Sequence, residues 1–188
     1  MNSISDEDAV ASLGRGDLAA LEILVERHGS RCQHLALGIT RDLATAQDVV
    51  ADSFLSLTEQ ARRFDHSRRF APWFNRIVVN RSINAAKRRR RWLTLPIWRA
   101  QTGEDPAHLV EIGEMRAAIR AAFERLAPRD RAVVVLRLVM DSSEAETADA
   151  LGCKVGTVKS RLARARRQLQ RHLGEFQINK AIAIGECQ

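Results

Sequence analysis

Hydrophobic residues recur at intervals of three and four along most of this chain, a spacing typical of one face of an amphipathic helix. The first such stripe consists of Leu18, Leu21, Leu24, Val25 and His28. Gly29 follows it and predicts a helix end, with a second helix from about Arg31 and a third from about Ala44. No stretch alternates between apolar and polar residues long enough to predict a strand.

The next part of the chain predicts a loop, a long helix and a linker. Residues 64–69 carry no apolar stripe and are expected to form a loop. Pro72 then suits the first turn of a helix, where its missing N–H group is not needed, and this helix runs into Lys87–Arg91. From Trp92 to about Gly113 the period is lost, and two prolines indicate a linker.

Helical period returns at Met115, is interrupted at Pro128 and continues to Leu173. Ser143 and Glu146 have the spacing of a capping box, which predicts a helix from Glu144 to Leu151. Gly152 is expected to end that helix in a left-handed conformation. A longer helix, Val155 to Leu173, follows after a short turn, which is the spacing of a DNA-binding helix-turn-helix.

The predicted fold class is therefore all-α, with two small helical domains joined by a flexible linker. The first domain is placed at residues 10–91, the linker at 92–112 and the second domain at 113–173. Residues 174–188 are expected to form a frayed tail. The length of 188 residues leaves room for two small domains, and no disulfide or metal is needed for folding.

The net charge of +7 is unevenly distributed along the chain. Residues 1–59 contain 10 acidic and 4 basic side chains, whereas residues 62–91 contain 11 basic and 1 acidic. Residues 155–173 contain 6 basic side chains and no acidic one. Two basic blocks after an acidic segment predict two contacts with a polyanion and a separate contact with a protein that has a basic surface.

The last predicted helix separates into an apolar side and a basic side. Its core-facing positions are Val158, Leu162, Ala165 and Leu169. The opposite side carries small, hydroxyl and basic residues that suit close entry into a major groove, namely Gly156, Thr157, Lys159, Ser160, Ala163, Arg164 and Arg167. No acidic residue lies within this helix to oppose its arginines, so DNA binding is favoured over a merely solvated basic face.

The first basic block mixes cationic and aromatic residues, as binding of unpaired bases requires. Trp73 and Phe74 have helical spacing and are expected to belong to the core. The loop Asp65–Phe70 and Asn80 are the better candidates for contacts with bases. Asp42, Asp48 and Asp52 in the preceding segment are candidates for a protein contact, with an ordinary solvated helix face as the alternative.

Other sequence features exclude several classes of protein. No apolar run is long enough to span a bilayer, and the N-terminal residues lack a secretory signal, so we expect a cytoplasmic protein without direct membrane insertion. The cysteines, Cys32, Cys153 and Cys187, show neither disulfide nor zinc-knuckle spacing. No cofactor or catalytic set is predicted, although His28, Cys32 and His34 leave a weak alternative of a metal enzyme.

The segments ATAQDVVADSF and FAPWFNRIVVNRSINAAKRRRR resemble region 2 of the extracytoplasmic-function (ECF) group of bacterial sigma factors. LAPRDRAVVVLRLVM and VGTVKSRLARARRQL are similar to region 4 of the same group. The resemblance covers about residues 12–173 in the order of the family. It implies a dissociable subunit that directs core RNA polymerase to promoters and initiates DNA melting, and that is held inactive by an anti-sigma factor.

The resemblance also implies three sets of contacts. Asp48, Asp52 and Phe54 would bind the β′ clamp helices of the polymerase. The −10 element would be contacted by Asp65, His66, Ser67, Arg68, Arg69, Phe70, Asn80, Arg81, Asn84, Lys87 and Arg88. Residues on and before the last helix would approach the −35 element, namely Lys154, Gly156, Thr157, Lys159, Ser160, Ala163, Arg164 and Arg167.

Several positions depart from the pattern of the family. Ala51 and Thr58 replace a common glutamine and tryptophan, which predicts a weaker clamp contact. Ser142, Thr147 and Ala150 replace commonly aliphatic residues, so the second domain is expected to be marginally stable. Lys154 stands where a serine N-cap is common, and a nearby DNA phosphate would offset its unfavourable charge at a helix N-terminus.

Two questions stay open at the level of sequence. A helix-turn-helix repressor or activator is the alternative function, although it would need neither the first basic block nor an acidic face. An apolar patch, Trp92, Leu93, Leu95, Ile97 and Trp98, lies in the linker and is expected to be covered by a partner or by the first domain. Alternatively, Trp92 and Leu93 extend the preceding helix into its core.

Overall fold

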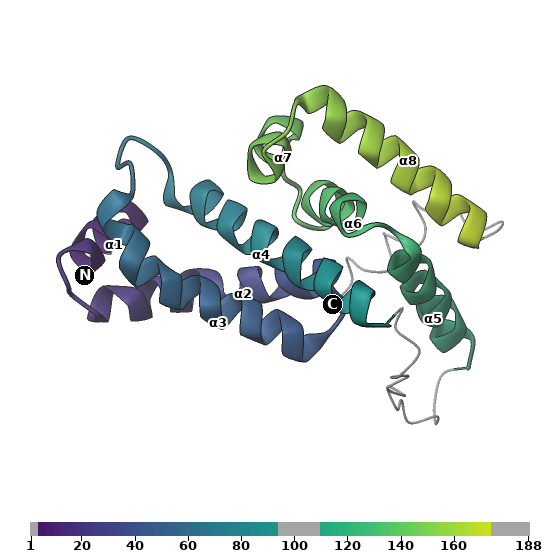
Figure 1. Ribbon diagram of the computed structural model, residues 1–188, viewed down its shortest axis with the longest axis horizontal. Coiled ribbons are helices and arrows are strands. Elements are labelled where there is room, and N and C mark those ends of the chain that lie inside the picture. Colours follow the sequence, from purple (N-terminus) through teal and green to yellow (C-terminus); the bar gives the residue numbers. More distant parts are fainter. Residues whose placement is uncertain (1–3, 94–109, 174–188) are drawn as a thin grey trace.

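A computed structural model of the protein describes residues 4–93 and 110–173, and within these ranges it contains helices and turns but no strand. Four helices form the N-terminal half and four form the C-terminal half, with the second group lying along one side of the first (Figure 1). The all-α class and the division into two helical parts are confirmed. Of the predicted linker, residues 92–93 and 110–112 are helical, whereas residues 94–109, including the patch residues Leu95, Ile97 and Trp98, lie outside the described residues, as does the tail.

The N-terminal half consists of α1 (Asp6–Gly14), α2 (Ala19–Thr40), α3 (Leu43–Gln60), a short 3₁₀ turn η1 (Ala61–Arg63) and α4 (Phe70–Leu93). Ser5 caps α1, because its hydroxyl accepts a hydrogen bond from the backbone N–H of Asp8 at 3.1 Å. Asp42 caps α3 in the same way through the N–H of Thr45 at 2.9 Å. The helix α1 was not predicted from the apolar pattern, yet it buries Ala9, Val10 and Leu13.

The predicted helix end at Gly29 is wrong, because α2 continues through this residue to Thr40. A glycine inside a helix costs about 1 kcal/mol relative to alanine, which is less than packing of the flanking turns can supply. The residues on both sides of Gly29 contribute to one core, including Leu24, Cys32 and Leu35. The helix ends instead at Arg41, which takes a left-handed conformation at φ 60°.

The C-terminal half consists of α5 (Val110–Arg125), α6 (Pro128–Val134), a π-helical turn η2 (Val135–Val139), α7 (Glu144–Leu151) and α8 (Val155–Leu173). Both helix signals around α7 are confirmed. Ser143 and Glu146 form a reciprocal capping box, and Gly152 ends the helix at φ 58°. The buried residues of α8 include Val158, Ala165 and Leu169, as its apolar stripe predicts.

One hydrophobic cluster is shared by the two halves, and two smaller clusters lie within the C-terminal half. Ala132, Val135 and Leu136 from the C-terminal half are buried in the same cluster as residues of α2 and α4. The helices α6 and α7 both pack on α4, and α6 and η2 also contact α2. The sequence pattern treats the halves as separate domains, and it gives no signal for this packing between them.

Gly38 allows the close approach of α2 and η2. A Cβ atom at this position would lie 2.8 Å from Cγ2 and 3.2 Å from Cγ1 of Val135. Valine is stiff about its first side-chain torsion and cannot simply swing away. The missing side chain of Gly38 is therefore a requirement of the packing between the halves.

No helix in the described ranges is long and apolar enough to cross a membrane.

We predict that Gly38→Ala lowers the free energy of unfolding by about 1–3 kcal/mol, because the added methyl group overpacks the contact with Val135. Gly29→Ala is the matched control in the same helix, since its Cβ would lie at an ordinary 3.7 Å from Cγ1 of Val25. This control should gain about 0.5–1 kcal/mol. Urea denaturation of both variants tests the contact, and equal stabilisation by the two alanines would contradict it.

A second prediction concerns Thr147, which is fully buried in α7 and whose hydroxyl has no hydrogen-bond partner among the described residues. Thr147→Val keeps the shape and removes an unsatisfied polar group, so it should stabilise the protein by about 1–2 kcal/mol. Thr40 is the control, because its buried hydroxyl donates to the carbonyl of Ala36 at 2.9 Å. Thr40→Val should therefore cost about 1 kcal/mol. Thermal unfolding of both variants would reveal shifts of opposite sign.

Candidate nucleic-acid interface

The loop between η1 and α4 is exposed and is organised by Asp65. One carboxylate oxygen of Asp65 accepts hydrogen bonds from the backbone N–H of Ser67 at 3.0 Å and from its hydroxyl at 2.7 Å. The other oxygen lies 3.2 Å from Nε of Arg68. The hydrogen bonds from Ser67, together with the charge of Arg68, lower the pKa of Asp65. Asp65 therefore shapes the loop, while His66, Ser67, Arg68 and Arg69 are exposed around it.

The predicted base contact by Phe70 is not available in this structure, because the ring is 0 % exposed. It stacks on Phe74 with ring centroids 5.3 Å apart and meets His28 edge-on at 5.1 Å. Its backbone N–H also donates to Glu7 Oε1 of α1 at 2.9 Å. Phe70 thus anchors the end of the loop in the core. Phe74 is buried and Trp73 is partly buried, as their spacing predicts.

The exposed face of α4 continues from this loop. Asn80, Asn84, Lys87 and Arg88 are exposed at spacings of four, three and one residues, which places them along one side of the helix. Arg81 is partly buried at the edge of this face. The structure therefore brings most of the predicted −10 residues onto one continuous polar and basic surface, with Phe70 beneath it.

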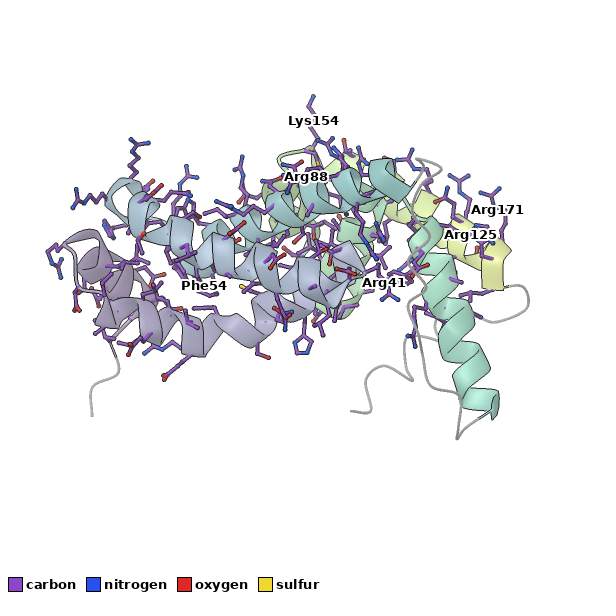
Figure 2. The ribbon with its side chains drawn as sticks, turned by 60° about the horizontal axis from the view of Figure 1, so that its bottom comes forward. Arg41, Phe54, Arg88, Arg125, Lys154 and Arg171 are labelled. Carbon is purple, nitrogen blue, oxygen red and sulfur yellow. The ribbon has the colours of Figure 1, made fainter. Side chains whose placement is uncertain are left out.

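The outer side of α8 is exposed as the sequence predicts. Gly156, Lys159, Ser160, Ala163, Arg164 and Arg167 are exposed, and Thr157 is partly buried. A Cβ atom at Gly156 would meet no atom within 4 Å, so packing within the chain does not require a glycine there. Lys154 accepts the first helical hydrogen bond through its carbonyl, from Thr157 N at 2.8 Å, and its side chain extends away from the body in Figure 2.

Lys159 and two of the arginines of α8 have acidic partners on other helices, contrary to the expectation from the helix alone. Lys159 Nζ lies 3.4 Å from Glu144 of α7. Arg161 and Arg164 both pair with Asp130 of α6, at 3.1 and 3.3 Å. The sequence analysis missed these partners because they come from other helices.

The outer face of α3 is acidic and partly apolar. Asp48 and Asp52 are exposed, whereas Phe54 is buried against Phe74 with ring centroids 4.7 Å apart. In Figure 2 the label of Phe54 lies over the packed helices of the N-terminal half. The predicted contact through Phe54 is not available in this structure, whereas Leu55 of the same helix is an apolar residue with an exposed fraction of 65 %. Leu55 lies seven residues after Asp48 and three after Asp52, a spacing that places all three on one side of the helix and that sequence reasoning passed over.

Asp42, the other acidic candidate, has a structural role. Its carboxylate caps α3 and pairs with Arg89 Nη2 of α4 at 3.1 Å. The side-chain hydrogen bond from Thr45 is the main reason why the pKa of Asp42 is lowered. This carboxylate is already committed to contacts within the chain.

The histidine and cysteine candidates show no metal-site geometry. Burial raises the pKa of the Cys32 thiol to about 12, and His28 Nε2 lies 2.7 Å from Asp6 Oδ2 of α1. Within residues 4–93 and 110–173 there is no group of three or more His, Cys, Asp or Glu side chains placed to hold a metal ion.

Comparisons with known proteins agree with this arrangement. Residues 24–92 match sigma-70 region 2, and residues 116–169 match sigma-70 region 4. The chain is 35 % identical over 170 residues to the ECF RNA polymerase sigma factor SigM of Mycobacterium tuberculosis, covering 90 % of this chain and 85 % of the relative. It is also 29 % identical to the RNA polymerase sigma factor NccH of Alcaligenes xylosoxydans xylosoxydans, covering 92 % and 97 % of the two chains.

Solved structures show the same fold. CnrH, in complex with the cytosolic domain of CnrY, matches with a TM-score of 0.67 and 25 % identity over 92 % of this chain and 99 % of CnrH. The sigma factor RpoE of Bartonella quintana, in complex with the anti-sigma factor NepR, has a TM-score of 0.63 at 20 % identity over 83 % and 98 % of the chains. The two sigma-70 regions, the relatives and the fold together place this chain in the sigma-70 family, as an ECF RNA polymerase sigma factor.

Proposed function

We propose that this sigma factor holds promoter DNA through two separate surfaces and core RNA polymerase through a third. In this proposal, residues 10–91 act as region 2, which binds the polymerase and the −10 element, and residues 113–173 act as region 4, which binds the −35 element. Residues 92–112 join them, and 174–188 form the tail. The observation that carries the proposal is the exposed polar and basic face of α4, because a repressor with the same helix-turn-helix would not need it.

The −10 surface consists of the loop and the outer side of α4. His66, Ser67, Arg68 and Arg69 offer donors and cations in a loop that Asp65 orders, which lowers the entropy lost on binding. Asn80 and Asn84 offer hydrogen-bonding amides one helical turn apart, while Arg81, Lys87 and Arg88 supply charge for the phosphates. Phe70 supports this surface from the core.

The −35 surface is the outer side of α8. Gly156 and Ala163 are small, which leaves room for close approach to a groove. Packing within the chain does not require a glycine at position 156. Arg164 and Arg167 can contact guanine edges, while Lys154, Thr157, Lys159 and Ser160 suit phosphates or bases. Both kinds of contact are needed, since phosphates set position and base edges set sequence.

The polymerase surface is the outer face of α3. Asp48 and Asp52 supply negative charge for a basic partner such as the β′ clamp helices, and Leu55 supplies an apolar centre. The charge of this face is opposite to that of both DNA surfaces. This difference in sign directs the partners to different sides of the chain.

The regulation and location of the protein follow from its relatives. RpoE was solved with an anti-sigma factor, and this chain adopts the same fold, so an anti-sigma factor is proposed as its inhibitor. The proposed activity is non-catalytic, requires no cofactor and takes place in the cytoplasm, where the polymerase and its DNA are located.

Run-off transcription with core polymerase on genomic fragments, followed by mapping of start sites, tests the function as a whole. If the chain acts as a sigma factor, core polymerase and this chain alone should give transcripts with defined start sites. A repressor or activator would give transcripts only when another sigma factor is added. That result would overturn the proposal.

We predict that the double variant Asp48→Lys, Asp52→Lys weakens binding to core polymerase at least about tenfold, because like charges would then face a basic partner. Glu26→Lys is the control, since it makes the same kind of charge reversal on an exposed residue of α2. Affinity for core polymerase can be measured by competition with a labelled wild-type chain. If the control variant loses as much affinity for core polymerase as a single Asp52→Lys variant, the assignment of the α3 face is wrong.

We predict that Lys154→Ser stabilises the protein and weakens its binding to DNA. A serine at this N-cap position can accept a helical N–H, which adds about 1 kcal/mol and raises the midpoint of thermal unfolding by about 2–4 °C. Loss of one phosphate contact should reduce the slope of log affinity against log salt by about 1. Unchanged DNA affinity, together with an unchanged salt slope, would remove Lys154 from the −35 surface.

A further inference from the structure

Asp130 is a buried carboxylate that connects α6 to the DNA-facing helix. Its side chain is 6 % exposed, and each of its two oxygens meets a different arginine of α8. Oδ1 accepts a hydrogen bond from Nη1 of Arg161 at 3.1 Å, and Oδ2 lies 3.3 Å from Nε of Arg164. A buried carboxylate requires such partners, because desolvation of an unpaired charge is costly.

The side chains of the two arginines differ in how exposed they are. The side chain of Arg161 is 23 % exposed and belongs to the boundary between α6 and α8. The side chain of Arg164 is 52 % exposed and lies on the outer side of α8. The contact of Arg164 with Asp130 is made through Nε, whereas the terminal nitrogens of a guanidinium are the ones that bind a guanine edge.

We infer that Asp130 is a positioning residue for promoter recognition, which fixes the guanidinium of Arg164 so that its terminal nitrogens meet one base pair of the −35 element. The inference rests on the proposed −35 surface and adds to it a residue that does not touch DNA. A free arginine loses rotamer entropy when it binds, and a preordered one loses less. This smaller loss of entropy favours binding to a guanine, which accepts two parallel hydrogen bonds from the guanidinium. Asp130 therefore raises the preference for guanine at one position.

A purely structural role for Asp130 has different consequences. It would neutralise Arg161 and stabilise the first turn of α6, where an acidic residue is favourable. Its loss would then weaken binding to every DNA sequence by the same factor. A positioning role predicts loss of preference at one base pair, with little change in affinity for non-specific DNA.

The test uses the full chain assembled with core polymerase and a library of promoters randomised across the −35 element. Sequencing of the transcripts gives the base preference at each position. With Asp130→Asn, we expect the preference for guanine at one position to fall about five- to tenfold, while the other positions keep theirs. Preference that is unchanged, or activity that falls equally on all sequences, would overturn the positioning role.

Glu144→Gln is the matched control, because Glu144 is the acidic partner of Lys159 on the same DNA-facing helix. Lysine is a point charge without a planar fork, so the loss of its partner should change all sequences alike. A selective loss of guanine preference in this control would overturn the inference, since removal of any nearby acid would then have the same effect.

Arg164→Lys keeps the test decisive if Asp130→Asn folds poorly, because it alters an exposed side chain and retains the charge. It should lose the same guanine preference as Asp130→Asn, and the double variant should lose no more. A further selective loss in the double variant would show that Asp130 acts through another residue. A wild-type chain that transcribes but selects no −35 sequence would overturn the inference together with the −35 surface, whereas absence of transcription with core polymerase would overturn the proposed function itself.

Discussion

The contact between Gly38 and Val135 sets the geometry of this protein. It lets α2 approach η2 closely enough for Ala132, Val135 and Leu136 to enter the core of the N-terminal half. Interiors pack densely and do not absorb an added methyl group without strain, so one missing side chain decides how the two halves meet. Polar contacts also join the halves, since Arg31 donates to the carbonyl of Met140 at 3.3 Å and Arg76 pairs with Asp149 at 3.7 Å.

This shared core leaves the outer faces of the helices free for partners. The face of α3 is acidic, the loop and face of α4 are polar and basic, and the face of α8 is basic with small residues. Buried aromatic residues lie beneath the proposed −10 surface, and the buried carboxylate of Asp130 pairs with Arg164 of the proposed −35 surface. In both cases the groups that would meet DNA are exposed, whereas the groups that order them are buried.

Local signals in the sequence predict much of this fold, and contacts between distant helices account for what they miss. The capping box at Ser143 and the left-handed Gly152 depend on a few neighbouring residues, and both are found as predicted. Gly29 has the local chemistry of a helix end, but packing on both sides carries α2 through it. The burial of Phe54 and Phe70 likewise depends on helices far along the chain, which the family resemblance does not reveal.

The two sigma regions of the free chain are expected to unfold as one cooperative body, and differential scanning calorimetry tests this most directly. For a two-state transition, the calorimetric enthalpy of unfolding equals the van't Hoff enthalpy. The shared core predicts a single transition with a ratio of these enthalpies close to one. Two resolved transitions, or a calorimetric enthalpy well above the van't Hoff value, would contradict it, because the halves would then unfold independently.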